Sequence, residues 1–378
     1  MSTAEVPMVR VVPSEGRVDW ALVVIVGLLV GFGMIMLVSA SSLSADKDYG
    51  NGLHYLTRQA GGLAGGIVAG WFVLTRPWGQ LRRLALPAFV VAVVSLIIVL
   101  TPLGVEANGA QRWISLGGIN VQPSEFAKLA VILMLANYLD ANSGRLHDVV
   151  GVVFPAIAIV APILLFLMFE PDFGTTVVTA GIAGVLLFVA GLRLLWVFGL
   201  GAIATAGGVV LIAIEPYRLE RFLSFLDPFA DPEGAGYQVV QGWIALASGG
   251  VAGAGRAGGS SQLGFLPEAH NDFIAAVVGE ELGAIGWIAM VLLYVGLIWR
   301  GTRIAARAPD LFGTLVASGV SGMFAMQILV NLGVVGGLLP AKGLVLPFMS
   351  YGASAIAAHT IGVALLLRTA AAAGRPST

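Results

Sequence analysis

The chain has 378 residues, of which 58% are hydrophobic and only 11% are charged. Soluble domains carry about 25% charged residues, so this composition indicates an integral membrane protein with many spans and excludes two soluble domains. The net charge of −1 and the lack of a basic stripe exclude a nucleic-acid partner. The absence of cysteine excludes disulfides and thiolate chemistry.

The first 19 residues are polar and predict a cytoplasmic tail, and the apolar run that follows, 20–43, predicts the first membrane span. A small-residue sequence, VSA at 38–40, resembles a signal-peptide cleavage site. However, the apolar region of a signal peptide is only about 7–15 residues long. We therefore expect this span to be retained.

Ten segments approach the roughly 20 apolar residues that a membrane-spanning helix needs. They are 20–43, 59–75, 83–101, 122–139, 150–169, 173–191, 193–214, 274–298, 311–337 and 350–371. They predict an all-α polytopic membrane protein with a single ten-helix domain over 20–371 and a short tail over 372–378. The moderate excess of Arg and Lys in alternate loops predicts that both tails are cytoplasmic.

One long loop, 215–273, separates the seventh and eighth predicted spans on the outer face. It is rich in Gly, Pro and aromatic residues and is too apolar for a disordered linker. Its sequence YRLERFLSFL predicts a short interfacial amphipathic helix. The sequence VVQGWIAL is a candidate for re-entry at the bilayer edge, which is allowed only where protein or water surrounds the backbone.

The end of this loop, LPEAHNDFIAAVVGEELG, is unusually acidic for so apolar a chain. Asp272 stands where a polar segment becomes an apolar run. It can serve either as the N-cap of the next helix or as a general base whose pKa burial raises. Glu280 and Glu281 are adjacent, so on a helix they point about 100° apart. We expect them to be a buried, supporting pair inside the bundle.

A second cluster lies in NGAQRWISLGGINVQPSEFAKLAVILML, residues 108–135. Glu125 and Lys128 are three residues apart on a predicted helix and so share a face. They can form an internal ion pair. Alternatively Arg112 and Lys128 form a cationic site for an anionic group, with Glu125 orienting Lys128 or helping to hold a divalent ion.

Two further polar segments are predicted on the outer face. In FEPDFGTT, Glu170 and Asp172 fall in a tight turn, where capping of the next helix is the simplest role. In NLGVVGGLLPAKGLVLPFMSYGASA, prolines and glycines break the backbone, and Lys342 either extends to the headgroups or serves a cavity. With Arg256, these cations predict an outward-opening cavity for an anionic, membrane-anchored molecule, flanked by apolar grooves for its lipid.

These motifs, over nearly the whole chain, resemble the SEDS family (shape, elongation, division and sporulation), the RodA/FtsW polytopic proteins. The matching sequences are QRWISLGGINVQPSEFAKLA, EPDFGTT, FLDPFADPEGAGYQVVQGWIALASGG, LPEAHNDFIAAVVGEELG and NLGVVGGLLPAKGLVLPFMSYGASA. The chain departs from the family pattern at Ala353, where SYGGS is usual, and at Asn271, where Thr is usual.

The resemblance implies a peptidoglycan glycosyltransferase that polymerises lipid II, with Asp272 as its catalytic acid. It places further residues of the motifs in substrate binding: Arg112, Glu125, Lys128, Asp172, His270, Lys342 and Ser350. The forms AKG, PEAH and DPFADP are closer to FtsW than to RodA. They imply a division-septum enzyme of the cytoplasmic membrane that works on a nascent glycan strand with divisome proteins and a class B penicillin-binding protein transpeptidase.

The implied reaction is attack of the acceptor 4-hydroxyl, deprotonated by Asp272, on C1 of the donor MurNAc. Cations placed around the departing pyrophosphate would lower the barrier, with or without a divalent cation. The alternatives are a lipid II flippase, a RodA-type elongation polymerase and a non-enzymatic scaffold. The lack of an internal repeat and the position of the charges at the outer edge favour a polymerase over a transporter.

Overall fold

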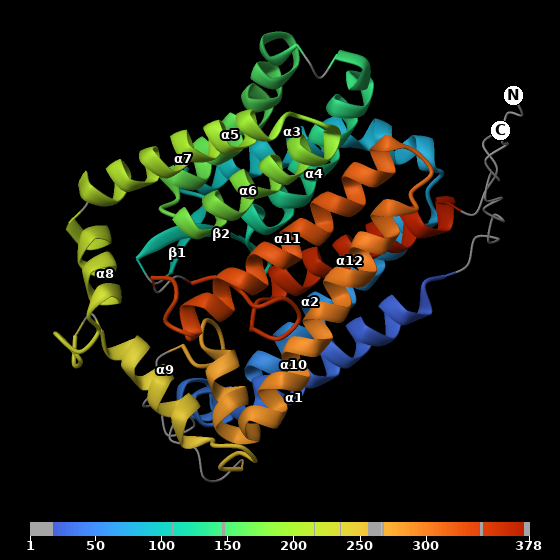
Figure 1. Ribbon diagram of the computed structural model, residues 1–378. Helices are drawn as coiled ribbons and strands as arrows, with labels where there is room; N and C mark the ends of the chain where they lie inside the picture. Colours follow the sequence, from blue (N-terminus) through green and yellow to red (C-terminus); the bar gives the residue numbers. More distant parts are fainter. Residues whose placement is uncertain are drawn as a thin grey trace, which may run out of the picture.

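The computed structural model describes residues 18–107, 109–145, 148–214, 216–234, 236–255, 266, 268–340 and 343–373. This part of the chain is a bundle of long helices with one small sheet (Figure 1). The long helices are α1 (Trp20–Tyr49), α2 (His54–Thr75), α3 (Trp78–Val99), α4 (Pro123–Ala141), α5 (Phe154–Phe169), α6 (Phe173–Ala190), α7 (Leu194–Ile214), α10 (Ile274–Ala306), α11 (Leu311–Val335) and α12 (Ala353–Ala373).

Each predicted span overlaps one of these long helices, so the helical membrane fold is confirmed. By length and hydropathy alone, seven helices of the described ranges can cross a membrane, and they coincide with α1, α3, α5, α6, α10, α11 and α12. The remaining three, α2, α4 and α7, do not meet the same criteria. The count of ten spans therefore stays a prediction.

Two helices run well beyond their predicted ends. The first predicted span, 20–43, continues to Tyr49, and the span predicted at 274–298 continues to Ala306. Both extensions carry charges, Asp46 and Lys47 in one and Arg303 in the other. An apolar pattern marks only the length of a helix in lipid, whereas the helix itself continues into water.

The prediction of an all-α protein is incomplete, because the segment between α3 and α4 forms a three-stranded antiparallel sheet. Its strands β1 (Gly104–Ala107), β2 (Ala110–Leu116) and β3 (Ile119–Val121) pair in that order. Glycines at 109, 117 and 118 have positive φ and make the two tight turns. The strands are too short for their alternation to stand out in the sequence.

The long loop between α7 and α10 contains two short helices. The predicted amphipathic helix is confirmed as α8 (Pro216–Leu226), and VVQGWIAL lies in α9 (Tyr237–Ser248). Helix α9 buries Val239 and Val240 and packs against α10 (Figure 1). Re-entry of this segment into the bilayer stays a prediction, and the predicted tails, 1–19 and 372–378, lie mostly outside the described residues.

Helices α11 and α12 form the centre of the bundle. Helix α11 packs against α4, α6, α10 and α12, and α12 packs closely against α2 (Figure 1). At the end of the bundle where α1 begins and α12 ends, Arg82 of α3 pairs with Asp140 and Asp310, so one cation joins α3 to α4 and to the start of α11. The opposite end carries the sheet and the predicted site.

Candidate functional site

The short loop before α10 places Asp272 at the end of the bundle that carries the sheet. The cap position of α10 is Phe273, and this cap makes no side-chain hydrogen bond. Asp272 is therefore not the N-cap that its sequence position allowed. Its carboxylate is half-buried and lies beside Gly343, where an added Cβ would be 3.2 Å from Oδ2.

Side-chain hydrogen bonds to the backbone fix the Asp272 loop. The Asn331 amide of α11 donates to the carbonyls of Asp272 at 3.1 Å and of Leu344 at 2.7 Å. The Ser350 hydroxyl donates to the carbonyl of Asn271 at 2.6 Å and accepts from the amide of Leu346 at 2.9 Å. The loop before α10 and the loop before α12 are thus one connected unit.

Ser350 was predicted to bind substrate, but its hydroxyl is buried and engaged with the two backbone groups. Gln59 of α2 extends the same unit, because its amide donates to the Ser350 carbonyl at 3.1 Å and accepts from the Gly352 amide at 2.9 Å. Sequence reasoning missed Gln59. In the sequence, Gln59 stands out only as a polar residue at the edge of an apolar run.

His270 lies in an aromatic cluster next to Asp272. Its ring is half-buried, 4.5 Å from the ring of Tyr55 and 5.9 Å from that of Tyr351 between centroids. Burial lowers the pKa of His270, and the nearby charge of Glu268 opposes that shift only in part. His270, two residues before Asp272, is therefore a neutral imidazole at neutral pH, able to donate or accept a hydrogen bond.

Arg112 of β2 connects the sheet to the turn between α5 and α6. Its guanidinium donates to the carbonyls of Glu170 at 3.1 Å and Pro171 at 2.7 Å. It forms no salt bridge with a carboxylate of the described residues. Arg112 therefore keeps a full positive charge that an anionic ligand can use.

Asp172 has the capping role that its tight turn suggested. Its carboxylate accepts from the Thr175 amide at 3.1 Å and so caps α6. Glu170, two residues before Asp172, is fully buried, and neither of its carboxylate oxygens has a hydrogen-bond partner among the described residues. Burial, together with the nearby charge of Asp172 and against the opposing charge of Arg112, raises the pKa of Glu170 to about 8. Glu170 was not among the predicted site residues.

Glu125 and Lys128 form the internal ion pair that their spacing allowed. The Lys128 ammonium lies 2.8 Å from the Glu125 carboxylate, and the two residues are 1% and 3% exposed. A cation that is buried and neutralised in this way is poorly placed to receive an anionic headgroup. Lys342 and Arg256, the other predicted cations, lie outside the described residues.

The predicted segments nevertheless gather at one end of the bundle through a continuous set of contacts. Arg112 joins the sheet to the α5–α6 turn, and the Gln122 amide at the end of the sheet donates to the Ser354 hydroxyl of α12 at 2.9 Å. Ser350 then joins the α12 loop to the Asp272 loop. Throughout the described ranges, no three His, Asp or Glu side chains group closely enough to hold a metal ion.

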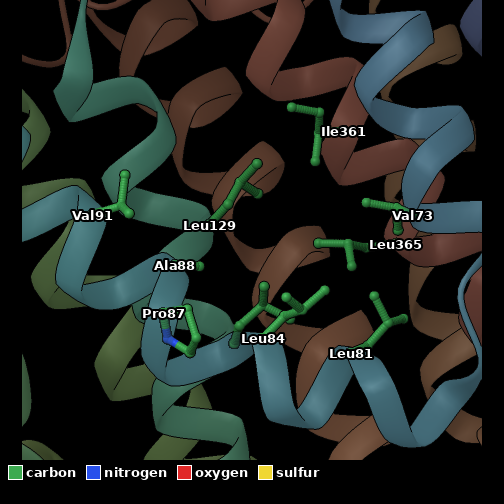
Figure 2. Close-up of a pocket in the computed structure, with 10 residues that line it drawn as sticks. Val73, Leu81, Leu84, Pro87, Ala88, Val91, Leu129, Ile361 and Leu365 are labelled. Carbon is green, nitrogen blue, oxygen red and sulfur yellow. The ribbon is translucent and has the colours of Figure 1, made fainter.

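An apolar groove of about 310 Å³ lies between α3 and α12 (Figure 2). Its lining comes from α2, α3, α4 and α12: Val73, Leu81, Leu84, Pro87, Ala88, Val91, Leu129, Leu133, Ile361 and Leu365. Such a surface can hold a lipid chain. None of these residues is a predicted site residue, and the groove follows the first half of α3, towards the end of the bundle opposite Asp272.

Comparison with known proteins agrees with this architecture. The family model for FtsW, RodA and SpoVE, described as a cell cycle protein, matches residues 19–374. The chain belongs to this family. Because the match covers almost the whole chain, it includes the sheet, the Asp272 loop and the segments around Arg112 and Ser350.

Two curated relatives match over nearly their full length. A protein of Trichlorobacter lovleyi named "Probable peptidoglycan glycosyltransferase FtsW" is 39% identical over 354 residues, which is 93% of each chain. The stage V sporulation protein E of Bacillus subtilis is 39% identical over 350 residues, 92% of this chain and 96% of that protein.

A solved structure also matches. It is a chain of a peptidoglycan synthase complex whose description concerns the coordination of polymerization and crosslinking. That chain is 33% identical with a TM-score of 0.79, and the alignment covers 94% of this chain and 98% of that one. The helical arrangement of Figure 1 is thus similar to the fold of that chain.

Proposed function

We propose that this protein is a peptidoglycan glycosyltransferase that polymerises lipid II into glycan strands during cell division. The names of its full-length relatives support the reaction class. One observation in the structure carries the assignment of the site. Asp272 is a half-buried carboxylate at the end of a membrane bundle, where the side chains of Asn331 and Ser350 hold its loop in place.

In the proposed reaction Asp272 is the general base. It takes the proton of the 4-hydroxyl of the acceptor GlcNAc as that oxygen attacks C1 of the donor MurNAc. The bond from C1 to the pyrophosphate breaks, and undecaprenyl pyrophosphate leaves with the bonding electrons. One displacement inverts the α-linked donor to a β-linked product, so one base suffices. General-base assistance of this kind typically contributes about 10²–10⁴-fold.

The ion pairs of the described residues support a choice among the cations that can stabilise the leaving pyrophosphate. Arg112 has no carboxylate ion pair among the described residues, whereas Lys128 is neutralised by Glu125. We therefore assign the pyrophosphate contact to Arg112 first, with Lys342 as the second candidate because it directly precedes Gly343 beside Asp272. A fixed positive charge at the departing oxygen lowers the barrier without reorganisation.

The likeness to a peptidoglycan synthase complex supports a transpeptidase partner of the class B penicillin-binding protein type. We place the enzyme in the cytoplasmic membrane at the division septum, with ten spans, both termini in the cytoplasm and Asp272 on the outer face. The excess of basic residues in the loops on the side of the termini supports this orientation.

The test is an Asp272→Asn variant, purified with its transpeptidase partner and supplied with labelled lipid II. We expect glycan-chain formation to fall by at least about 10²-fold. Asp46→Asn is the matched control, because Asp46 is an exposed acid near the end of α1. Polymerisation by Asp272→Asn at a rate close to that of the control would remove Asp272 as the base.

A lipid II flippase is the second candidate, and one observation favours it. Polar side chains are buried along the bundle helices: His359 of α12 lies 3.1 Å from Gln327 of α11 (Nε2 to Oε1), and Lys128 pairs with Glu125 in α4. Buried polar groups of this kind often mark transport paths. Transport and polymerisation assays in proteoliposomes from one preparation distinguish the two functions.

A further inference from the structure

Helix α10 is broken at Gly283, eleven residues after Asp272. The backbone of Gly283 has φ 64° and ψ −163°, a conformation that is essentially restricted to glycine. The break divides the helix into a short arm, 274–282, and a long arm, 284–306. The short arm is almost wholly buried and leads directly to Asp272, whereas the long arm has many exposed apolar side chains.

A segment of the long loop, 249–255, occupies this break. In an unbroken helix the carbonyl of Glu280 would accept from the amide of residue 284, and that of Glu281 from residue 285. Here both carbonyls accept from the inserted segment instead. The Ala254 amide donates to Glu280 at 2.8 Å, and the Gly255 amide donates to Glu281 at 3.1 Å.

The same segment also provides hydrogen-bond acceptors for the backbone amides on the other side of the break. The Ala284 amide donates to the Gly250 carbonyl at 3.0 Å, and the Ile285 amide donates to the Val251 carbonyl at 3.3 Å. The segment therefore supplies partners for both the carbonyls and the amides that the break separates. Buried backbone groups of a broken helix need such partners, so the inserted segment makes the break stable.

The insertion is a contact between backbones. A Cβ added at Gly253 would lie 2.1 Å from the Glu281 carbonyl oxygen, and one added at Gly283 would lie 2.4 Å from the Gly253 amide nitrogen. Both distances are far below van der Waals contact. Only glycine at these positions lets the segment enter the helix.

The short arm connects this contact to the site, so a small change of angle at Gly283 becomes a larger displacement at Asp272. Residues 272–283 span about 16 Å in a helix, so a change of 10° at Gly283 would move Asp272 by about 3 Å. A misplacement of about 1 Å at a reacting group can cost about 10²-fold in rate. Ser39 of α1 further fixes the arm, because its hydroxyl lies within 2.8 Å of both carboxylate oxygens of Glu281.

We propose that segment 249–255 is a positioning element: inserted into the break of α10, it sets the direction of the short arm and thereby the position of Asp272. The inference rests on the proposed role of Asp272 as the base. It assigns a function to a glycine-rich segment in the middle of the long loop and to Gly283, which is eleven residues from Asp272.

The insertion itself is tested by a disulfide. The chain has no cysteine, so Val251→Cys with Ile285→Cys gives a single thiol pair. Both side chains are exposed, and their backbones are hydrogen-bonded. Oxidation should close the pair, which labelling with a maleimide polymer detects, and the oxidised protein should polymerise lipid II at the rate of the reduced one. Failure of the pair to close, or loss of activity on closure, would overturn the proposal.

Gly283→Ala tests the consequence for the site. Alanine cannot adopt the Gly283 backbone and its Cβ excludes the segment, so in this background the thiol pair should no longer close. The value of kcat should fall by at least about tenfold while KM for lipid II stays unchanged, since the binding groups are not altered. Gly184→Ala on α6, where an added Cβ meets nothing within 4 Å, is the matched control.

A double variant separates this proposal from the proposed function. If Gly283 acts through Asp272, Gly283→Ala should cause little further loss of rate in the Asp272→Asn background. Full additivity of the two losses would contradict the positioning role even where Asp272 is confirmed as the base. Conversely, an active Asp272→Asn variant would show that Asp272 is not the base. The disulfide result, and with it the insertion of segment 249–255 into the break, would still stand.

Discussion

Two charged regions of this protein look alike in sequence and differ in structure. Asp272 and Lys128 each stand near the start of a long apolar helix in a polar motif. Asp272 is half-buried in a loop that is fixed through its backbone, whereas Lys128 is 1% exposed and paired with Glu125 in its own helix. A partner within the same helix thus turns a candidate binding charge into part of the buried core.

The largest effect should come from breaking the buried pair. Lys128→Met leaves the Glu125 carboxylate buried without its cation, which typically costs about 3–5 kcal/mol of stability. The double variant Glu125→Gln/Lys128→Met removes both charges, so it should recover most of that loss. Thermal unfolding in detergent measures both. Equal destabilisation of the single and double variants would show that the pair is not the relevant interaction.

A smaller effect, on rate, should come from loosening the Asp272 loop. Ser350→Ala removes two hydrogen bonds to the backbone, each worth about 1 kcal/mol. We expect kcat to fall by about tenfold with KM unchanged, because the loop holds the base. Ser41→Ala is the control, since Ser41 is also buried but bonds only to its own helix. An increase in KM alone would instead support the predicted contact of Ser350 with substrate.

The most gradual effect, spread over a range of pH, concerns Glu170, which is buried like Lys128 but whose carboxylate accepts no hydrogen bond from the described residues. Burial raises its pKa from 4.5 to about 8, so between these values the folded protein holds one proton more than the unfolded chain. Stability should therefore fall as pH rises through this window, by about 1.4 kcal/mol for each pH unit.

Glu170→Gln should remove this pH dependence, because the amide does not titrate. The melting temperature of wild-type protein and of the variant, measured from pH 5 to pH 9, provides the test. Asp172→Asn weakens the cap of α6 and also removes a charge that helps to raise the pKa of Glu170, so in this variant the dependence should persist over a narrower pH window. If the melting temperature of Glu170→Gln depends on pH as strongly as that of the wild-type protein, another group causes the dependence.

The sequence predicted the positions of the helices well because lipid imposes a simple rule, a long apolar run. It also offered the capping by Asp172 and the Glu125–Lys128 pair as alternatives to substrate binding, since both depend on spacings within one helix or turn. It failed on the sheet at 104–121 and on Glu170. Short strands show little alternation in the sequence. Both acids of the turn are buried, and the packing of the turn decides that Asp172 caps α6 while the Glu170 carboxylate has no hydrogen-bond partner among the described residues.

The break of α10 at Gly283 could not be predicted either, because the segment that fills it lies about 30 residues earlier in the chain. The same holds for the role of Ser350, whose partners are in the Asp272 loop. Local patterns identify which residues carry charge or lack a side chain. Contacts between distant segments determine whether those residues bind, support or position.

In the proposed function the chemistry occurs at Asp272, while the Glu125–Lys128 pair is structural. This division of roles can be tested by measuring lipid II polymerisation by Asp272→Asn and by Glu125→Gln/Lys128→Met side by side, at matched amounts of folded protein. We expect a folded, inactive Asp272→Asn and a double variant that polymerises at close to the wild-type rate. An active Asp272→Asn, or a folded double variant without activity, would contradict it.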